Sequence, residues 1–228
     1  IEVIATEQIS LIIRQLAKLS DKDESIWLDY AKQEQWQIFV DNGKQILPLT
    51  PVKPLSYHIN ENIELTFTAD IFIHVNHQVN QLMVKQALAW LMLTKTDKVL
   101  DLFCGLGNFT LPIANIAADV VGIEGIDSMV LQATNNAKQN GIDNCQFHQA
   151  NLNADWQNQA WAQQHYDKVL LDPARAGAYQ ALEQLVKLAI KQILYVSCDP
   201  TTLAKDSKLL INHGYQITKI ALVDMFSQ

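Results

Sequence analysis

Short apolar runs alternate with helix-length segments from residue 79 onward, and this alternation constrains the fold more than any other feature of the sequence. A helical stretch at 79–93 is followed by apolar runs at residues 98–103, 119–123, 145–148, 168–171, 193–196 and 216–223. Strands that are separated by helices pair in parallel through right-handed crossovers. The pattern therefore predicts an α/β fold built on a doubly wound sheet.

Residues 1–76 lack this regularity and predict a small α+β subdomain. Apolar alternation at 1–4 and 9–16 precedes a helix-like stretch at 21–35, and strand-like runs follow at 36–40 and 63–68. The prolines that come between these two runs predict a connector, because each removes a backbone donor and restricts the residue before it. They are Pro48, Pro51 and Pro54. We place the domain boundary between residues 76 and 77, so that the second domain covers 77–228.

Composition narrows the class of protein. The chain has 228 residues, of which 49% are hydrophobic and 18% charged, so it can bury a core and is not disordered. Its formal charge of −7 argues against a protein that coats polyanions in general, which needs a basic surface. Neither a signal peptide nor an apolar run long enough to span a membrane occurs in it.

The three cysteines Cys104, Cys145 and Cys198 are widely spaced and form no C-x-x-C pair. This spacing disfavours a disulfide framework and a zinc or iron–sulfur site. We therefore expect no metal site in this chain and a reducing, cytoplasmic compartment.

A polar residue or a glycine turn follows each of the first five runs. The set consists of Asp101 with Gly105 and Gly107, then Glu124, Asn151, Asp172 and Cys198. The carboxyl ends of parallel strands meet at one edge of the sheet, where open α/β folds bind ligands. Strand ends are commonly polar, so each residue alone has an ordinary explanation, but the full set predicts a binding edge.

The first of these turns carries two glycines, which permit positive φ and let a ligand approach the backbone closely. Gly105-x-Gly107-x-x-Thr110 matches half of the dinucleotide fingerprint. Glu124 follows at the end of the next strand, where a carboxylate can accept hydrogen bonds from ribose hydroxyls. Both NAD and an adenosyl cofactor offer such hydroxyls, so these residues leave both open.

The last two turns carry a carboxylate and a thiol. Pro173 keeps Asp172 extended and directs its carboxylate out of the strand end. Cys198 precedes Asp199, the expected N-cap of a helix with proline in its first position. The positive end of that helix favours negative charge on the thiol, whereas Asp199 opposes it. Arg175 could pair with a carboxylate or hold a phosphate.

These turns, at residues 101–110, 171–177 and 195–200, together with 72–76 and Asn80-Gln81, resemble the S-adenosylmethionine-dependent RNA uracil-C5 methyltransferases. The motifs are most similar to those of the bacterial enzymes that form 5-methyluridine in 23S ribosomal RNA. The resemblance implies a Rossmann-like class I methyltransferase domain, S-adenosylmethionine as cofactor and 23S ribosomal RNA as partner, with no DNA and no membrane. It implies the cofactor-binding residues His74, Phe103, Asn108, Glu124, Asn151 and Asp172.

By the same resemblance, Cys198 is the catalytic nucleophile. C5 of uracil is a poor nucleophile, and addition of sulfur at C6 converts the ring into an enolate whose C5 can take a methyl group. A general base must then remove the C5 proton so that the sulfur can leave. The target base has to leave its RNA stack to reach this edge.

The chain departs from the family pattern in several places. His74 stands where the family has glutamine, and Asp199 where it has asparagine. The resemblance further implies that the chain is a fragment lacking both ends. The RNA-binding β-barrel and the cysteines of a [4Fe–4S] cluster would precede Ile1, and the catalytic glutamate and last strand would follow Gln228. We expect such a fragment to be inactive alone.

Two other functions fit part of the sequence. A fragment without its general base could bind cofactor or RNA without turnover. An NAD-dependent oxidoreductase would explain the glycine turn and Glu124, but the third glycine of the fingerprint is replaced by Thr110.

Overall fold

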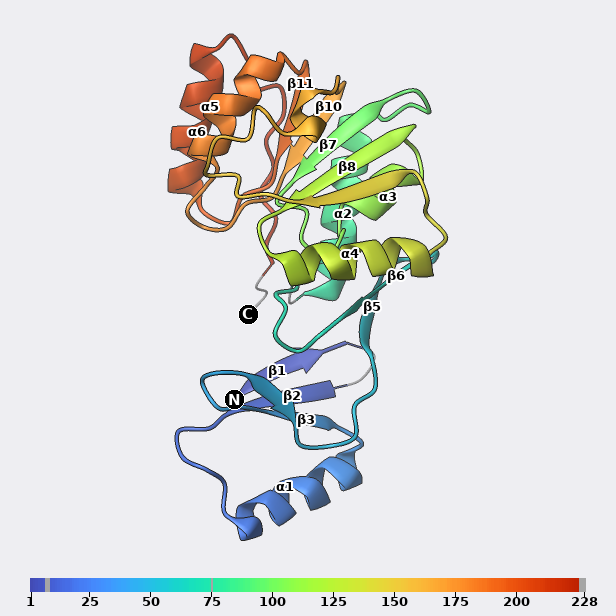
Figure 1. The fold of residues 1–228 in the computed structure, drawn as a ribbon, viewed down its shortest axis with the longest axis vertical. Helices are drawn as coiled ribbons and strands as arrows, with labels where there is room; N and C mark the ends of the chain where they lie inside the picture. Colours follow the sequence, from blue (N-terminus) through green and yellow to red (C-terminus); the bar gives the residue numbers. More distant parts are fainter. Residues whose placement is uncertain (7–8, 75, 226–228) are drawn as a thin grey trace.

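The computed structural model describes residues 1–6, 9–74 and 76–225. Val75 of the 72–76 motif and the chain end at Gln228 lie outside the described residues. Within them, a four-stranded sheet lies at one end of an elongated molecule and a five-stranded α/β sheet at the other (Figure 1). A two-stranded hairpin lies between them. The expected order of an α+β region followed by a doubly wound sheet is confirmed.

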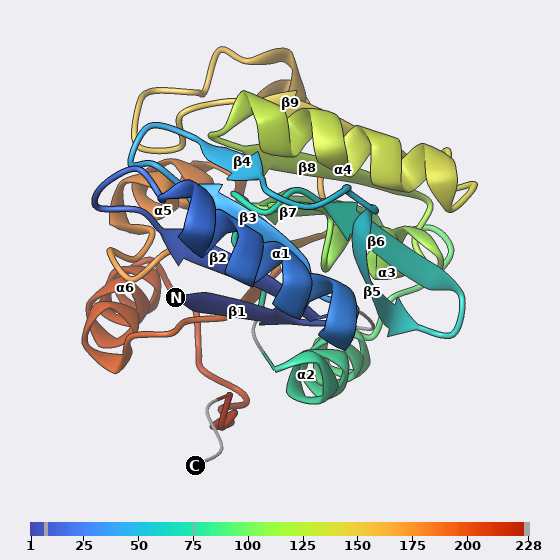
Figure 2. The same cartoon turned by 90° about the horizontal axis from the view of Figure 1, so that it is seen from below.

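The N-terminal sheet has the order β1-β2-β3-β4, with one parallel pair, β2 and β3. Helix α1 connects that pair and lies across one face of the sheet (Figure 2). The elements are β1 (Glu2–Ala5), β2 (Ile9–Arg14), α1 (Asp21–Glu34), β3 (Gln37–Asp41) and β4 (Ile46–Pro48). Ser20 caps the helix by accepting a hydrogen bond from the N–H of Asp23. Strand β4 was not expected, because it is short and ends on a proline.

The hairpin of β5 (Leu55–Asn60) and β6 (Ile63–Phe67) is tied to helix α4 (Asp127–Gln139) by amide side chains. Asn136 accepts from the N–H of Thr66 at 3.0 Å and donates to its carbonyl at 3.2 Å. Asn140, just past the helix end, makes the same two kinds of contact with Glu64. These amides satisfy backbone groups of β6 that have no strand beside them.

The five-stranded sheet has the order β11-β10-β7-β8-β9, and every neighbouring pair is parallel. Its strands are β7 (Lys98–Leu102), β8 (Asp119–Glu124), β9 (Cys145–Gln149), β10 (Lys168–Leu171) and β11 (Gln192–Tyr195). Each of these five strands coincides with an expected run to within a residue at either end. The prediction of a parallel, doubly wound sheet is confirmed.

Helices cover both faces of this sheet. On one face lie α2 (His77–Leu91), α3 (Thr110–Ala114) and α4, and on the other α5 (Tyr179–Leu185), α6 (Pro200–Asn212) and the 3-10 turns η1 (Ala160–Gln163) and η2 (Val186–Leu188). Successive strand residues point to opposite cores, as Val99 and Leu100 do. None of the helices in the described ranges is long and apolar enough to cross a membrane.

The strand expected at 216–223 is absent, which corrects the sequence prediction. These residues have no assigned strand, and Leu222 is 96% exposed. Lys219 of this segment contacts α2, with its Nζ 5.8 Å from the centre of the Trp90 ring. Apolar alternation predicts extended backbone, but a strand also requires a neighbour for its hydrogen-bond ladder.

Candidate functional site

The carboxyl ends of the five parallel strands are aligned at one edge of the sheet. Leu102 at the end of β7 pairs in register with Ile123 of β8 and Leu171 of β10, and Leu171 pairs with Tyr195 of β11. The residues that follow these positions therefore emerge along the same edge. The expectation that the polar strand-end residues share one edge is confirmed.

The turn after β7 has an unusual backbone. Phe103 has φ 63°, Gly105 φ 54° and Gly107 φ 91°, all in the left-handed region. Glycine tolerates this conformation, whereas an aromatic residue rarely adopts it, so Phe103 is strained. A Cβ built on Gly105 would meet no atom within 4 Å, which leaves open space directly above this backbone.

Glu124 joins the end of β8 to the glycine turn. Its Oε2 accepts a hydrogen bond from the N–H of Gly105 at 3.1 Å. Its Oε1 accepts from the N–H groups of Gly125 at 2.7 Å and Ile126 at 3.1 Å. A carboxylate has about four lone-pair positions, so Glu124 supports the turn and retains capacity for one further donor.

Asp101, inside β7 just before the glycine turn, is a buried carboxyl with an incomplete set of partners. Its Oδ2 accepts from Thr110 Oγ1 at 2.6 Å, whereas Oδ1 is buried without a hydrogen-bond partner among the described residues. Burial raises the pKa of Asp101 to about 7, and the charges of Asp172 and Glu124 act in the same direction. Asp101 was not among the expected cofactor-binding residues. An acid within a buried strand was the signal that could have included it.

His74 and Asp172, expected to share a site, are in contact. His74 Nε2 lies 3.3 Å from Asp172 Oδ2, and the two side chains are 18% and 20% exposed. The ring of Phe72 lies edge-on to the imidazole with centroids 5.8 Å apart. The structure thus brings together residues 98 positions apart, from the segment before α2 and from the end of β10.

Asn108 faces the interior of the domain. It is 8% exposed, and its Oδ1 accepts from Asn80 Nδ2 at 2.8 Å and from Tyr57 Oη at 3.3 Å. Its Nδ2 donates to Asn80 Oδ1 at 3.0 Å. This reciprocal amide pair fixes the glycine turn against α2 and β5. The role of Asn108 in holding a cofactor stays a prediction.

Asn151 is exposed in the turn after β9. Its Oδ1 accepts from the N–H of Asn153 at 3.0 Å, which forms an Asx turn. The side chain is therefore held at the edge of the sheet, beside the described strand ends.

Cys198 is the exposed member of the three cysteines. Burial raises the pKa of Cys104 well above its ordinary value and that of Cys145 to about 11. Cys198 lies between β11 and α6, next to Asp199, which caps the helix as expected. Of the three thiols, Cys198 is the most exposed, Cys145 is partly buried and Cys104 is buried.

The Asp199 cap keeps a negative charge beside this thiol. Its Oδ1 accepts from the N–H groups of Thr201 at 2.8 Å and Thr202 at 3.0 Å. These hydrogen bonds, with a smaller contribution from the charge of Arg175, lower the pKa of Asp199. Whether Arg175 pairs with a carboxylate or holds a phosphate stays a prediction.

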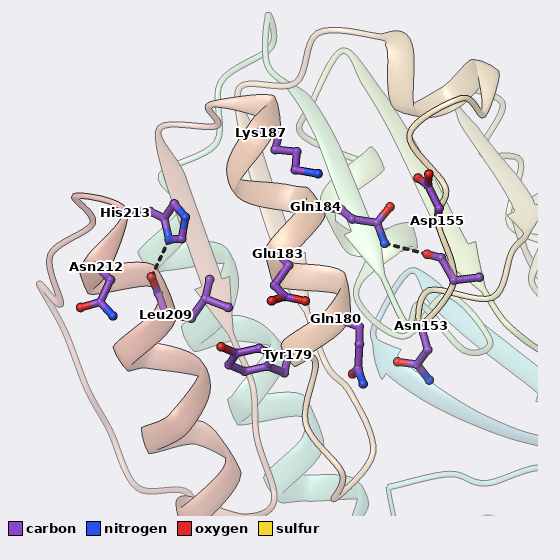
Figure 3. Close-up of a pocket in the computed structure, with 11 residues that line it drawn as sticks. Asn153, Asp155, Tyr179, Gln180, Glu183, Gln184, Lys187, Leu209, Asn212 and His213 are labelled. Atoms are coloured by element: carbon purple, nitrogen blue, oxygen red, sulfur yellow. Dashed lines mark hydrogen bonds between the residues drawn. The ribbon is translucent and has the colours of Figure 1, made fainter.

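A shallow groove of about 580 Å³ lies beside the turn that carries Asn151. It is bounded by α5, by the end of α6 and by residues 153–155 (Figure 3). Gln184 Nε2 closes one side by donating to the carbonyl of Ala154 at 2.6 Å. None of the seven expected site residues lines it. The groove belongs to the helical layer and lies outside the strand-end constellation.

A known protein family matches the part of the chain that carries the strand-end residues. The family described as tRNA (Uracil-5-)-methyltransferase matches residues 55–228. The chain is 51% identical over 227 residues to a 23S rRNA (uracil(1939)-C(5))-methyltransferase RlmD of Colwellia psychrerythraea and 46% identical over 224 residues to that of Pasteurella multocida. It covers 48% and 51% of these two proteins, so it spans about half the length of the curated relatives. These alignments include 97% and 98% of the chain.

Solved structures confirm the fold. The tRNA (uracil-54, C5)-methyltransferase of Pyrococcus abyssi, in complex with S-adenosyl-L-homocysteine, matches 97% of this chain and 54% of its own, with a TM-score of 0.74 and 22% identity. Trm5b from the same organism matches 93% of this chain and 66% of its own, with a TM-score of 0.62 and 14% identity. At these identities the likeness concerns the fold alone, which is that of a class I methyltransferase.

Proposed function

The chain belongs to the tRNA (uracil-5-)-methyltransferase family, and from this premise we propose that it carries the cofactor edge and nucleophile of an RNA methyltransferase. The reaction transfers a methyl group from S-adenosylmethionine to C5 of a uridine in 23S ribosomal RNA. Membership of this family argues against the NAD-dependent alternative. The observation that carries the proposal is the exposed thiol of Cys198 on the same sheet edge as the glycine turn and the His74–Asp172 pair.

The strand edge fits a cationic adenosyl cofactor. Asp101 presents a buried oxygen without a partner, Gly105 leaves open space above its backbone, and Asp172 adds a second carboxyl group. Carboxylates favour a positively charged ligand. When bound, S-adenosylmethionine supplies an electrophilic methyl group on a positively charged sulfur.

Different strand-end residues would bind different parts of this cofactor. Glu124 would accept a hydrogen bond from the ribose with its remaining lone pair. His74 and Asp172 would bind beside it, with Phe103, Asn108 and Asn151 completing the site.

Cys198 would act as the nucleophile on the base. Its thiolate forms a bond to C6 of uracil, and the C5–C6 π electrons move toward the C4 carbonyl, so that C5 becomes nucleophilic. C5 takes the methyl group as the S–CH3 bond of the sulfonium breaks, which leaves neutral S-adenosylhomocysteine. A general base then removes the C5 proton. The returning electrons break the S–C6 bond and release the thiolate. No oxidant or reductant enters these steps.

The exposure of Cys198 suits a macromolecular substrate. A uridine stacked in RNA cannot reach a thiol at a strand end, so the nucleotide has to be splayed out. An exposed turn between β11 and α6 accepts such a nucleotide without opening the core. Free thiols and a ribosomal substrate fit action in the cytoplasm.

The decisive experiment replaces the thiol. In the full-length protein that carries this sequence, we expect Cys198→Ala to lower methylation of a 23S rRNA transcript more than about 1,000-fold, as removal of a nucleophile commonly does. Binding of S-adenosylhomocysteine, measured by calorimetry, should change little. Cys145→Ala is the matched control, because Cys145 lies at the amino end of β9, and it should retain activity. Full methylation by Cys198→Ala would contradict the proposal.

A further inference from the structure

Asp206 is a buried carboxyl group that the proposed reaction does not use. It lies in α6 and is 1% exposed. Its Oδ2 accepts a hydrogen bond from the N–H of Ala178 at 2.7 Å and another from Tyr195 Oη at 2.7 Å. Burying a carboxyl group costs free energy unless it is hydrogen-bonded. The two short hydrogen bonds to one oxygen therefore indicate that Asp206 holds the groups that donate them.

The two donors lie on the two segments that lead to the reacting groups. Ala178 ends the turn that begins at Asp172, after β10, and Tyr195 ends β11, three residues before Cys198. Asp206 itself lies about two helical turns beyond Asp199, the residue next to Cys198. One carboxyl oxygen therefore connects the strand end that carries Asp172 with the strand end that carries Cys198.

The turn after β10 approaches α6 more closely than most backbones could. Gly177 has φ +78°, and a Cβ built on it would lie 2.7 Å from Asp206 Oδ2 and 3.0 Å from Thr202 Cβ. Thr202 Oγ1 donates to the carbonyl of Arg175 at 3.2 Å. The glycine permits a close approach that these hydrogen bonds then hold.

We propose that Asp206 is a positioning residue, which holds the turn after β10 and the turn after β11 in a fixed relation. Its hydrogen bonds set the placement of Asp172 relative to the Cys198 thiol. This inference rests on the proposed function, because that function assigns Asp172 to the cofactor and Cys198 to the base. Methyl transfer requires both groups to meet their ligands at once, and small displacements of reacting groups are costly in rate.

The test measures how fast Cys198 forms a covalent adduct with an RNA substrate. A 5-fluorouracil-containing RNA with S-adenosylmethionine traps the cysteine adduct, because fluorine at C5 blocks the final proton loss. In the full-length protein that carries this sequence, we expect Asp206→Ala to slow adduct formation by about 10- to 100-fold while the Kd for S-adenosylhomocysteine changes less than about threefold. Asp206→Asn retains an acceptor oxygen, so it should recover most of the rate.

Two further variants keep the test decisive. Tyr195→Phe removes one donor and leaves the Ala178 contact, and it should slow adduct formation by about three- to tenfold even if Asp206→Ala fails to fold. Asp97→Ala is the matched control, because it removes a buried carboxyl group at the opposite edge of the sheet and should leave the adduct rate of the folded protein unchanged. Wild-type adduct rates in folded Asp206→Ala or in Tyr195→Phe would overturn the inference.

Hydrogen exchange separates this inference from the proposed function. In Asp206→Ala the amides of residues 174–178 should exchange at least about tenfold faster relative to those of β7, and in Asp97→Ala they should not. A wild-type protein that forms no adduct would contradict the proposed function, whereas unchanged exchange at residues 174–178 in Asp206→Ala would contradict the role of Asp206.

Discussion

At the amino edge of the five-stranded sheet the buried charges are paired, whereas at the carboxyl edge a buried carboxyl oxygen has no partner among the described residues. At the amino edge Lys168 Nζ lies 2.7 Å from Asp97 Oδ2 and donates to the carbonyl of Met92 at 2.8 Å. Burial alone would raise the pKa of Asp97, but the hydrogen bonds from Lys168 and Thr94 outweigh it and lower the pKa. At the carboxyl edge burial raises the pKa of Asp101 to about 7.

The difference distinguishes a buried charge that stabilises the fold from one that is placed to bind a ligand. A carboxylate that is paired with a cation and hydrogen-bonded, as Asp97 is, contributes to the stability of the fold. A buried carboxyl group with an oxygen that no donor reaches costs stability, and such groups are typical of functional sites. The two edges of one sheet, built from the same strands, therefore predict opposite results in stability and in binding measurements.

The largest expected effect is the pH dependence that Asp101 causes in the ligand-free protein. The folded state holds this proton more tightly than the unfolded state, so Asp101 stabilises the fold below pH 3.8 and loses that contribution as the pH rises through about 7. A pKa displaced from 3.8 to about 7 corresponds to about 4 kcal/mol. Urea unfolding between pH 4 and 8 should show this loss in the wild type and not in Asp101→Asn.

The ion pair of Lys168 and Asp97 at the amino edge provides the next test. Lys168→Met leaves Asp97 buried without its cation, and we expect the free energy of unfolding to fall by about 3 kcal/mol in urea titrations. The Kd for S-adenosylhomocysteine should stay within about twofold of wild type. Lys187→Met, at an exposed lysine, is the control and should change stability by less than about 0.5 kcal/mol. Weaker cofactor binding in Lys168→Met would remove the distinction between the edges.

The smallest expected effect is at Glu124. Glu124→Gln removes the charge and leaves one acceptor oxygen, so either Gly105 or both Gly125 and Ile126 lose their acceptor, and stability should fall by about 1 kcal/mol. Affinity for S-adenosylhomocysteine should fall by about 10- to 30-fold, since a hydrogen bond to a charged acceptor is lost. Glu183→Gln, on the exposed face of α5, should change neither quantity. Calorimetry and urea unfolding of the same samples decide between binding and stability.

Sequence periodicity predicted the strands and helices of the second domain closely, because each depends on local spacing. The five parallel strands and the cap at Asp199 lie where the pattern placed them, and the helix expected at 79–93 is found two residues earlier, at His77–Leu91. The strand at 216–223 failed for the same reason, since alternation reports extended backbone and not the presence of a neighbouring strand. Strand β5 was missed because its apolar residues follow directly after the proline connector.

The sequence predicted which residues belong to the candidate site, but it did not predict the contacts among them. The strand-end residues were identified from their order along the chain, and the parallel topology places them at one edge. The contact between His74 and Asp172 and the amide pair of Asn108 with Asn80 join segments far apart in sequence. No local pattern encodes such pairs, because they depend on how the elements pack.

The sequence by itself determined the alternation of strands and helices, the glycines of the first turn, the thiol before a helix cap and the family. These depend on steric preferences of single residues and on short-range periodicity. Only the tertiary structure decided which charges are satisfied. Asp97, Asp101 and Asp206 are the same residue type in the sequence, yet one pairs with a lysine, one retains an oxygen without a partner among the described residues and one connects two strand ends. Their different roles arise because the strength of a buried charge interaction depends on the partners that packing brings within hydrogen-bonding distance.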